Sequence, residues 1–119
     1  MSVSEKKRLN AIEKANMAQE CISRGYIKSA VDLLNESIKI DPDNAGFYAK
    51  RSTAYYQQDK FDKALEDANT AVEKDSTKPS GHIRKMMTLL HVGNVEGAST
   101  AAKEAVKPAD LKDNASVLS

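Results

Sequence analysis

Residues 45–78, AGFYAKRSTAYYQQDKFDKALEDANTAVEKDSTK, decide the fold of this chain. Apolar and small side chains recur there every three or four positions, which is the spacing of one face of an α-helix. The stretch therefore predicts two amphipathic helices joined by a short polar turn. In the second helix, Ala64 and Ala68 lie one helical turn apart. Side chains this small let a neighbouring helix approach closely, so we expect the two helices to pack as a hairpin.

The hairpin recurs along the chain with a period of 34 residues. One hairpin cannot bury both of its apolar faces, whereas stacked copies bury a continuous core. We therefore expect an all-α fold of three stacked hairpins. The rows that keep this separation include Ala30, Ala64 and Ala98; Leu34, Ala68 and Ala102; Ile38, Val72 and Val106; and Gly25, Asp59 and Gly93.

The period and its helix–turn–helix content resemble the tetratricopeptide repeat (TPR) family over roughly residues 11–110. The resemblance implies an α-solenoid, a right-handed superhelix whose concave face is lined by the first helix of each pair. The family's Trp row departs from the pattern, since Lys14, Tyr48 and His82 occupy it here. The expected organisation is an extension of the first helix over residues 1–10, repeats at 11–44, 45–78 and 79–110, and a flexible tail at 111–119.

Capping and breaking residues set the expected helix ends. Ser2 and Glu5 have the spacing of a capping box that starts the first helix early, and Gly25 ends that helix. The last helix is the weakest, because Gly97 stands among other poor helix formers, and Pro108 ends it. Outside the middle hairpin, the expected helices are about 4–24, 27–40, 80–92 and 95–107.

The composition excludes several classes of protein. The 18 basic and 17 acidic residues nearly balance, which argues against a nucleic-acid or membrane-surface binder. No stretch approaches the roughly 20 apolar residues of a membrane span, and the first residues contain no apolar run. Cys21 is the only cysteine, so no internal disulfide is expected and a reducing cytoplasmic or nuclear location fits.

Motifs for catalysis or metal binding are missing from the sequence. His82, His91 and Cys21 do not share a helix face, so a metal site is not expected. Residues 41–46 begin like a calcium loop, but the oxygen ligands required further along are not there. The chain also lacks a Gly-rich phosphate loop and a nucleophile motif. We therefore expect a non-enzymatic protein without a cofactor.

The concave face implied by the TPR resemblance would carry donors in a row. Asn16, Lys50 and Arg84 are 34 residues apart on the first helices of the repeats. Amide and cationic groups suit a carboxylate, and apolar neighbours suit a hydrophobic side chain, so the expected ligand is a short extended peptide with acidic residues. The candidate peptide-binding residues are Asn16, Gln19, Lys50, Thr53, Tyr56, Arg84 and Met87.

The segments 47–55, 65–68 and 81–85 look like those of TPR domains in heat-shock co-chaperones. Those domains bind the acidic C-terminal tails of large chaperones through a carboxylate clamp of two Lys, two Asn and one Arg. In this chain, Arg84 alone matches; Ala15 and Ser80 stand at the Lys positions, and Gln19 and Lys50 at the Asn positions. The resemblance therefore implies either weak binding of chaperone tails or a different ligand.

Two other interpretations stay open. Lys50 and Arg84 are ordinary solvated charges in one of them, much as Arg51 is expected to pair with Asp67 or Glu66. In the other, the chain is a structural or self-assembly module, such as the N-terminal part of a co-chaperone with a CS domain. It would then form a homodimer through its convex face or through its uncapped C-terminal end, at Ala98, Ala101, Ala102 and Ala105.

Overall fold

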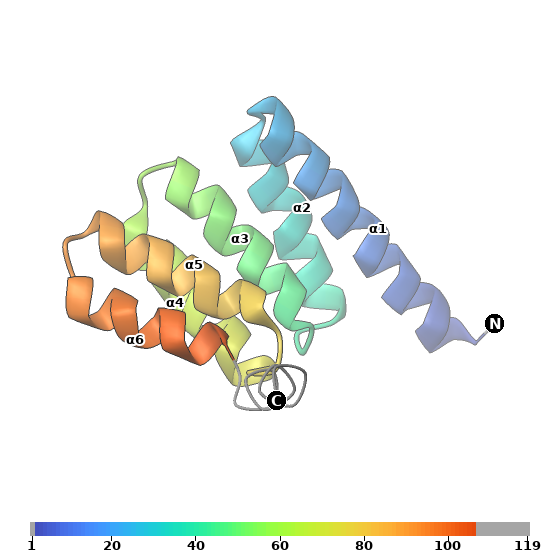
Figure 1. Ribbon diagram of the computed structural model, residues 1–119. Coiled ribbons are helices and arrows are strands. Elements are labelled where there is room, and N and C mark those ends of the chain that lie inside the picture. The colour runs from blue at the N-terminus through green and yellow to red at the C-terminus, as the bar shows by residue number, and fades with distance from the viewer. Residues whose placement is uncertain (1, 107–119) are drawn as a thin grey trace, which may run out of the picture.

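The computed structural model describes residues 2–106, which form six α-helices and no strand (Figure 1). The predicted all-α fold of three stacked hairpins is confirmed. Within the same range, no helix has the length and apolar character needed to cross a membrane. The helices are α1 (Val3–Arg24), α2 (Ile27–Ile40), α3 (Ala45–Gln57), α4 (Phe61–Lys74), α5 (Pro79–His91) and α6 (Val95–Ala105).

The helix ends follow from capping residues and turn glycines. Ser2 Oγ accepts a hydrogen bond from the Glu5 backbone N–H at 3.2 Å, as the capping box predicts. Helix α2 has the predicted bounds, whereas α6 ends at Ala105, two residues earlier than expected. The low helix propensity of several residues in α6 disfavours its extension by a further turn. The expected tail at 111–119 lies outside the described residues.

The period of the sequence extends to the backbone conformation of the turns. Gly25, Asp59 and Gly93 occupy the same repeat position and have φ values of 86°, 60° and 87°. Glycine adopts this left-handed region without penalty, and Asp is among the few other residues that tolerate it. Each hairpin therefore reverses direction through the same local geometry.

Small side chains allow the helices of the solenoid to approach closely. Ala30 and Ala64 are fully buried, and Ala98 is 2% exposed. Leu34, with 0% exposure, is the largest fully buried side chain. The core cluster around Leu34 comprises Ala11, Ala15, Ala18, Ile22, Ala30, Leu34, Phe47 and Ala54.

The residues in the family's Trp row tie helices to the turns before them. The Tyr48 hydroxyl donates to the Pro42 carbonyl oxygen at 2.7 Å. One period later, His82 Nε2 lies 3.0 Å from the Ser76 carbonyl oxygen, in the matching hydrogen bond. A hydrogen bond to the preceding turn is thus present at two of the three positions where the family has Trp.

The solenoid curves with α1, α3 and α5 on its inner side. Helix α1 packs against α3 and α3 against α5, whereas the backbones of α2 and α4, and likewise of α4 and α6, are not in contact. Figure 1 shows α1, α3 and α5 following one another across the molecule. Successive helices are in contact on one side of the stack and farther apart on the other, so the stack curves toward the side with the contacts. The inner side therefore presents the first helix of each pair, as the TPR resemblance implied.

Candidate peptide-binding groove

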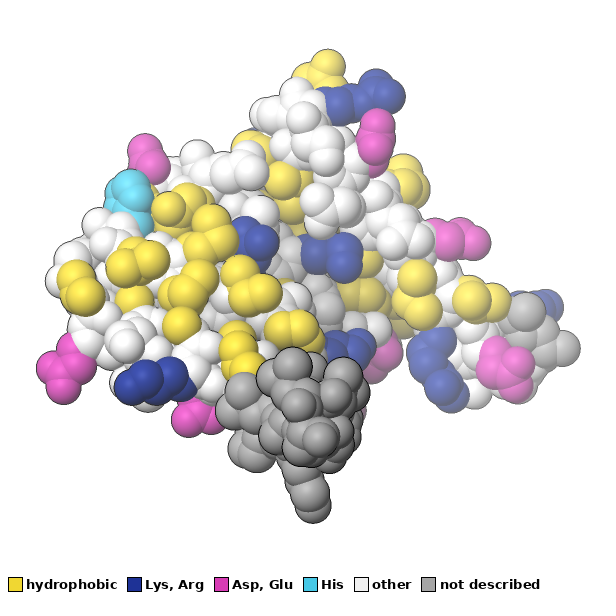
Figure 2. Space-filling view, viewed as in Figure 1, with side chains coloured by type: hydrophobic (Ala, Val, Ile, Leu, Met, Phe, Trp, Pro, Cys, Tyr) yellow, Lys and Arg dark blue, Asp and Glu magenta, His cyan; other side chains and the backbone are white. Residues whose placement is uncertain are grey.

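A cavity of about 160 Å³ opens on the inner side of the solenoid, where α1, α3 and α5 meet. Four of the seven predicted binding residues line it, namely Gln19, Lys50, Thr53 and Arg84. Figure 2 shows basic side chains in the hollow between α1 and α5. The small residues Gly46, Ala49 and Ser80 complete the lining and leave the space between the longer side chains empty.

The other three predicted residues do not line this cavity. Asn16 is exposed on α1, and Met87 is half-buried on α5. The half-buried Tyr56 packs edge-on against Phe61 and His91, with ring centroids 5.5 Å apart in both pairs. At the α1 end, Gln19 lines this cavity and Asn16 does not. Each repeat of a solenoid is rotated relative to the one before, so equal spacing in sequence does not give one straight row.

Four of the five clamp-equivalent positions face the same space. Gln19, Lys50, Ser80 and Arg84 line the cavity together. The fifth, Ala15, is 2% exposed and belongs to the core between helices. A cation at that position would have to displace core packing before it reached a ligand.

Sequence reasoning missed Gly46 and Ala49, which form the floor of the cavity beside Lys50. Their positions relative to Thr53 follow helical spacing, and this is the signal by which they are found. Their contribution is the absence of a large side chain, which a search for chemical groups does not detect.

The two cations in the cavity are free of partners within residues 2–106. Neither Lys50 nor Arg84 makes a side-chain hydrogen bond or an ion pair there. Arg51, the neighbour of Lys50, differs: its guanidinium donates two hydrogen bonds of 2.8 Å to the Asp67 carboxylate, which confirms the predicted ion pair. Lys50 and Arg84 are therefore available to an external anion, whereas Arg51 serves the fold.

The environment of Arg51 stabilises its charged form. Its hydrogen bonds to Asp67 raise the pKa of Arg51 above its ordinary value, although burial opposes the shift. The raised pKa means that the stabilisation linked to the charge on Arg51 is lost only as the pH rises above the ordinary pKa of arginine. The pair therefore adds no pH dependence in the neutral range.

The N-terminus of α5 adds to the positive character of the cavity. Pro79 occupies its first turn, Ser80 follows, and Lys78 at the N-cap position provides no side-chain cap. The free N–H groups of a helix N-terminus carry a partial positive charge that favours anions. Because Ser80 lines the cavity, this end of α5 and the side chains of Lys50 and Arg84 favour the same ligand, a carboxylate.

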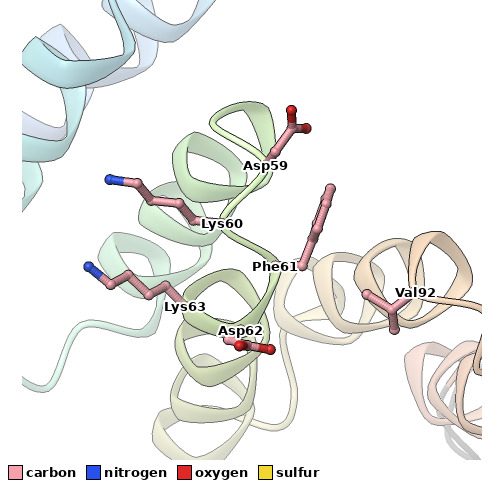
Figure 3. Close-up of a pocket in the computed structure, with 6 residues that line it drawn as sticks. All are labelled: Asp59, Lys60, Phe61, Asp62, Lys63 and Val92. Atoms are coloured by element: carbon pink, nitrogen blue, oxygen red, sulfur yellow. The ribbon is translucent and has the colours of Figure 1, made fainter.

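A second hollow, of about 490 Å³, lies at the α3–α4 turn and the end of α5 (Figure 3). Its walls carry two carboxylates and two ammonium groups, so their charges balance. In Figure 3, Lys60 and Lys63 point away from the Phe61 ring and Val92. This hollow offers no concentrated charge to a peptide carboxylate. Its lining residues are Asp59, Lys60, Phe61, Asp62, Lys63 and Val92.

Metal-binding chemistry has no counterpart in the part of the chain that the structure describes. Residues 2–106 contain no group of three His, Cys, Asp or Glu side chains that could hold a metal ion. Cys21 is half-buried and packs against the core cluster, as a small apolar residue does.

Comparisons with known proteins agree with the geometry. Tetratricopeptide repeat protein 28 of Homo sapiens is 31% identical over 90 residues, which is 76% of this chain and 4% of that protein. Protein STIP1 homolog of Dictyostelium discoideum is 31% identical over 97 residues, 82% of this chain and 17% of that protein. Among solved structures, the TPR2B domain of yeast Sti1 in its pHsp70 complex has a TM-score of 0.78 and 28% identity, covering 82% of this chain and 78% of that one.

This chain belongs to the tetratricopeptide repeat family, and within it is similar to the TPR domains of heat-shock co-chaperones. It spans less than a fifth of the length of the two relatives named above. No protein-family model matches the sequence. Departures from the family's motif residues, including the missing Trp row, are in keeping with that result.

Proposed function

We propose that this chain is a non-enzymatic protein-interaction module, a co-chaperone-like adaptor that binds an extended acidic peptide, or an acidic C-terminus, in its concave groove. One observation carries the proposal: Lys50 and Arg84 lie in one cavity and have no partner within residues 2–106. Two half-buried cations beside a helix N-terminus favour a ligand with at least one carboxylate.

The relative solved as a pHsp70 complex supports a chaperone tail as the ligand. Affinity for such a tail would be lower than in a domain with the full clamp, because Ala15 and Ser80 replace two lysines. A hydrogen bond to a charged group contributes about 1.5–3 kcal/mol, so each missing lysine weakens binding roughly tenfold or more. We further propose that the chain acts in the cytoplasm or the nucleus, where such tails are found.

The proposal is tested with a synthetic heptapeptide that carries two Glu side chains and a free C-terminal Asp. Fluorescence anisotropy is expected to show saturable binding to the whole chain. Amidation of the peptide's C-terminus should weaken binding at least about tenfold, because a carboxylate that accepts charge-assisted hydrogen bonds is lost. Equal affinity for the free and amidated peptides would contradict capture of a carboxylate in the groove.

Ser80→Lys is expected to strengthen binding of the same peptide. Ser80 is exposed and lines the cavity, so a lysine there restores one clamp cation without displacing the core. The added charge-assisted hydrogen bond should raise the affinity about tenfold. Ser80→Met, of similar length but uncharged, is the matched control, and an equal gain from methionine would argue against an electrostatic groove.

A further inference from the structure

Within residues 2–106, the surface of α5 and α6 at the C-terminal end of the stack lacks the cover that the equivalent surfaces of the earlier repeats receive. Ile22 is 5% exposed, whereas Leu90, in the same repeat position, is 51% exposed. Leu34 is fully buried, whereas its counterpart Ala102 is only half-buried. In the first two repeats the helix pair that follows covers these positions, and no helix of the described residues follows α6.

The uncovered residues form one apolar surface, which we call the end face and define as Leu90, Val95, Ser99, Ala102 and Val106. Val95 is 67% exposed and Val106 is 49% exposed. Figure 2 shows hydrophobic side chains gathered over α5 and α6. A contiguous apolar patch exposed on a protein surface often marks a site of interaction with another protein.

The spacing of the end face on α6 is that of a helix-pairing seam. Val95, Ser99, Ala102 and Val106 are separated by four, three and four residues, as the a and d positions of a heptad are. Valine at both ends with Ser and Ala in the middle would let a second helix approach closely. The surface is therefore shaped for another helix laid along α6.

Two charged residues beside the seam indicate that the partner helix is α6 of a second copy of this chain. Glu96 and Lys103 are seven residues apart at the same edge of the seam, both exposed. Neither side chain has an ion pair within residues 2–106. If α6 of a second copy runs antiparallel, with a two-fold axis between Ser99 and Ala102, Val95 lies opposite Val106 and Glu96 lies near Lys103 of the other copy. In a parallel arrangement the two copies of Glu96 would lie at opposite edges of the seam, and likewise the two copies of Lys103, so neither would meet an opposite charge.

We propose that two copies of this chain associate through the end face, with their α6 helices antiparallel. The pairing is closed, since the same patch is used on both copies, and the Glu96–Lys103 contact occurs twice, once on each side of the two-fold axis. It leaves the groove at Lys50 and Arg84 on the inner side of each copy, so a dimer would present two peptide sites.

Sedimentation equilibrium of the whole chain at several loading concentrations tests the proposal. The expected result is a mass that rises from one chain toward two, with a midpoint in the micromolar range that small interfaces give. A strict monomer up to about 1 mM overturns the proposal, and would leave the end face to a different partner or to residues 107–119.

Charge variants test the arrangement without touching the core. Glu96→Lys should weaken dimerisation roughly tenfold, because two attractive contacts become repulsive. The double swap Glu96→Lys plus Lys103→Glu should restore it. An unchanged dissociation constant in the single variant, or no recovery in the double one, overturns the antiparallel pairing.

Ala102→Glu should abolish the dimer, because it places two carboxylates near the two-fold axis. Ser29→Glu, at an exposed position on α2, is the matched control and should dimerise like the unmodified chain. Circular dichroism at low concentration checks that both variants keep their helix content. A folded Ala102→Glu variant that still dimerises overturns the assignment of the end face.

Discussion

Replacing both Lys50 and Arg84 with alanine is expected to abolish binding of an acidic peptide and to leave helix content unchanged. Each side chain would contribute about 1.5–3 kcal/mol through a charge-assisted hydrogen bond to a carboxylate. Losing both would weaken binding by a factor of roughly 10²–10⁴, beyond the range of calorimetry for a ligand of micromolar affinity. Isothermal titration calorimetry measures the affinity, and far-ultraviolet circular dichroism measures the fold.

The double variant also removes two positive charges from the whole protein, so its control must do the same. Lys28→Ala plus Lys39→Ala has that property, since both lysines are exposed on α2, outside the groove. This control should bind the peptide nearly as well as the unmodified chain. Undiminished affinity in the Lys50 and Arg84 variant, or an equal loss in the control, would show that the groove is not the binding site.

Leu34→Ala is expected to lower the free energy of unfolding by about 3.5 kcal/mol, the middle of the range for buried leucines. Leu34 is fully buried in the cluster formed by α1, α2 and α3, where its removal leaves a cavity that close-packed alanines cannot fill. The melting temperature should fall by roughly 10 °C or more. Thermal unfolding followed by circular dichroism measures the change.

Leu9→Ala is the matched control for Leu34→Ala. Leu9 lies on α1 and is 44% exposed, so the same atoms are removed from a site that is partly hydrated already. Its cost should be about 1 kcal/mol or less. Comparable losses in both variants would mean that the core does not lie where α1, α2 and α3 meet.

The helices and turns could be predicted because their signals are local. The period of 34 residues placed Ala30, Ala64 and Ala98 at buried positions, and the row of Gly25, Asp59 and Gly93 at the turns between helices. Helical spacing and turn residues act over a few positions, and each of these patterns occurs once in every one of the three repeats. Because the three repeats show the same patterns, the fold could be predicted although the Trp of the family motif is missing.

The membership of the groove could only partly be predicted, because it depends on how the repeats are rotated. Lys50, Arg84 and Gln19 line the same cavity, but Asn16 is not among its lining residues. Ala15, at a position where the clamp has Lys, is 2% exposed and lies in the core. Rotation between repeats is a sum of many side-chain contacts, and no short motif encodes it.

Each helix of this protein touches only those within two places of it along the chain, from α1 with α3 to α3 with α5. Contacts between residues close in sequence cost little loop entropy to form, so proteins built in this way fold in microseconds to milliseconds. The packing of α1–α6 therefore does not depend on first joining segments that are far apart in the sequence. Ordering can thus begin in any one hairpin and spread to its neighbours, which makes the acquisition of structure a local event.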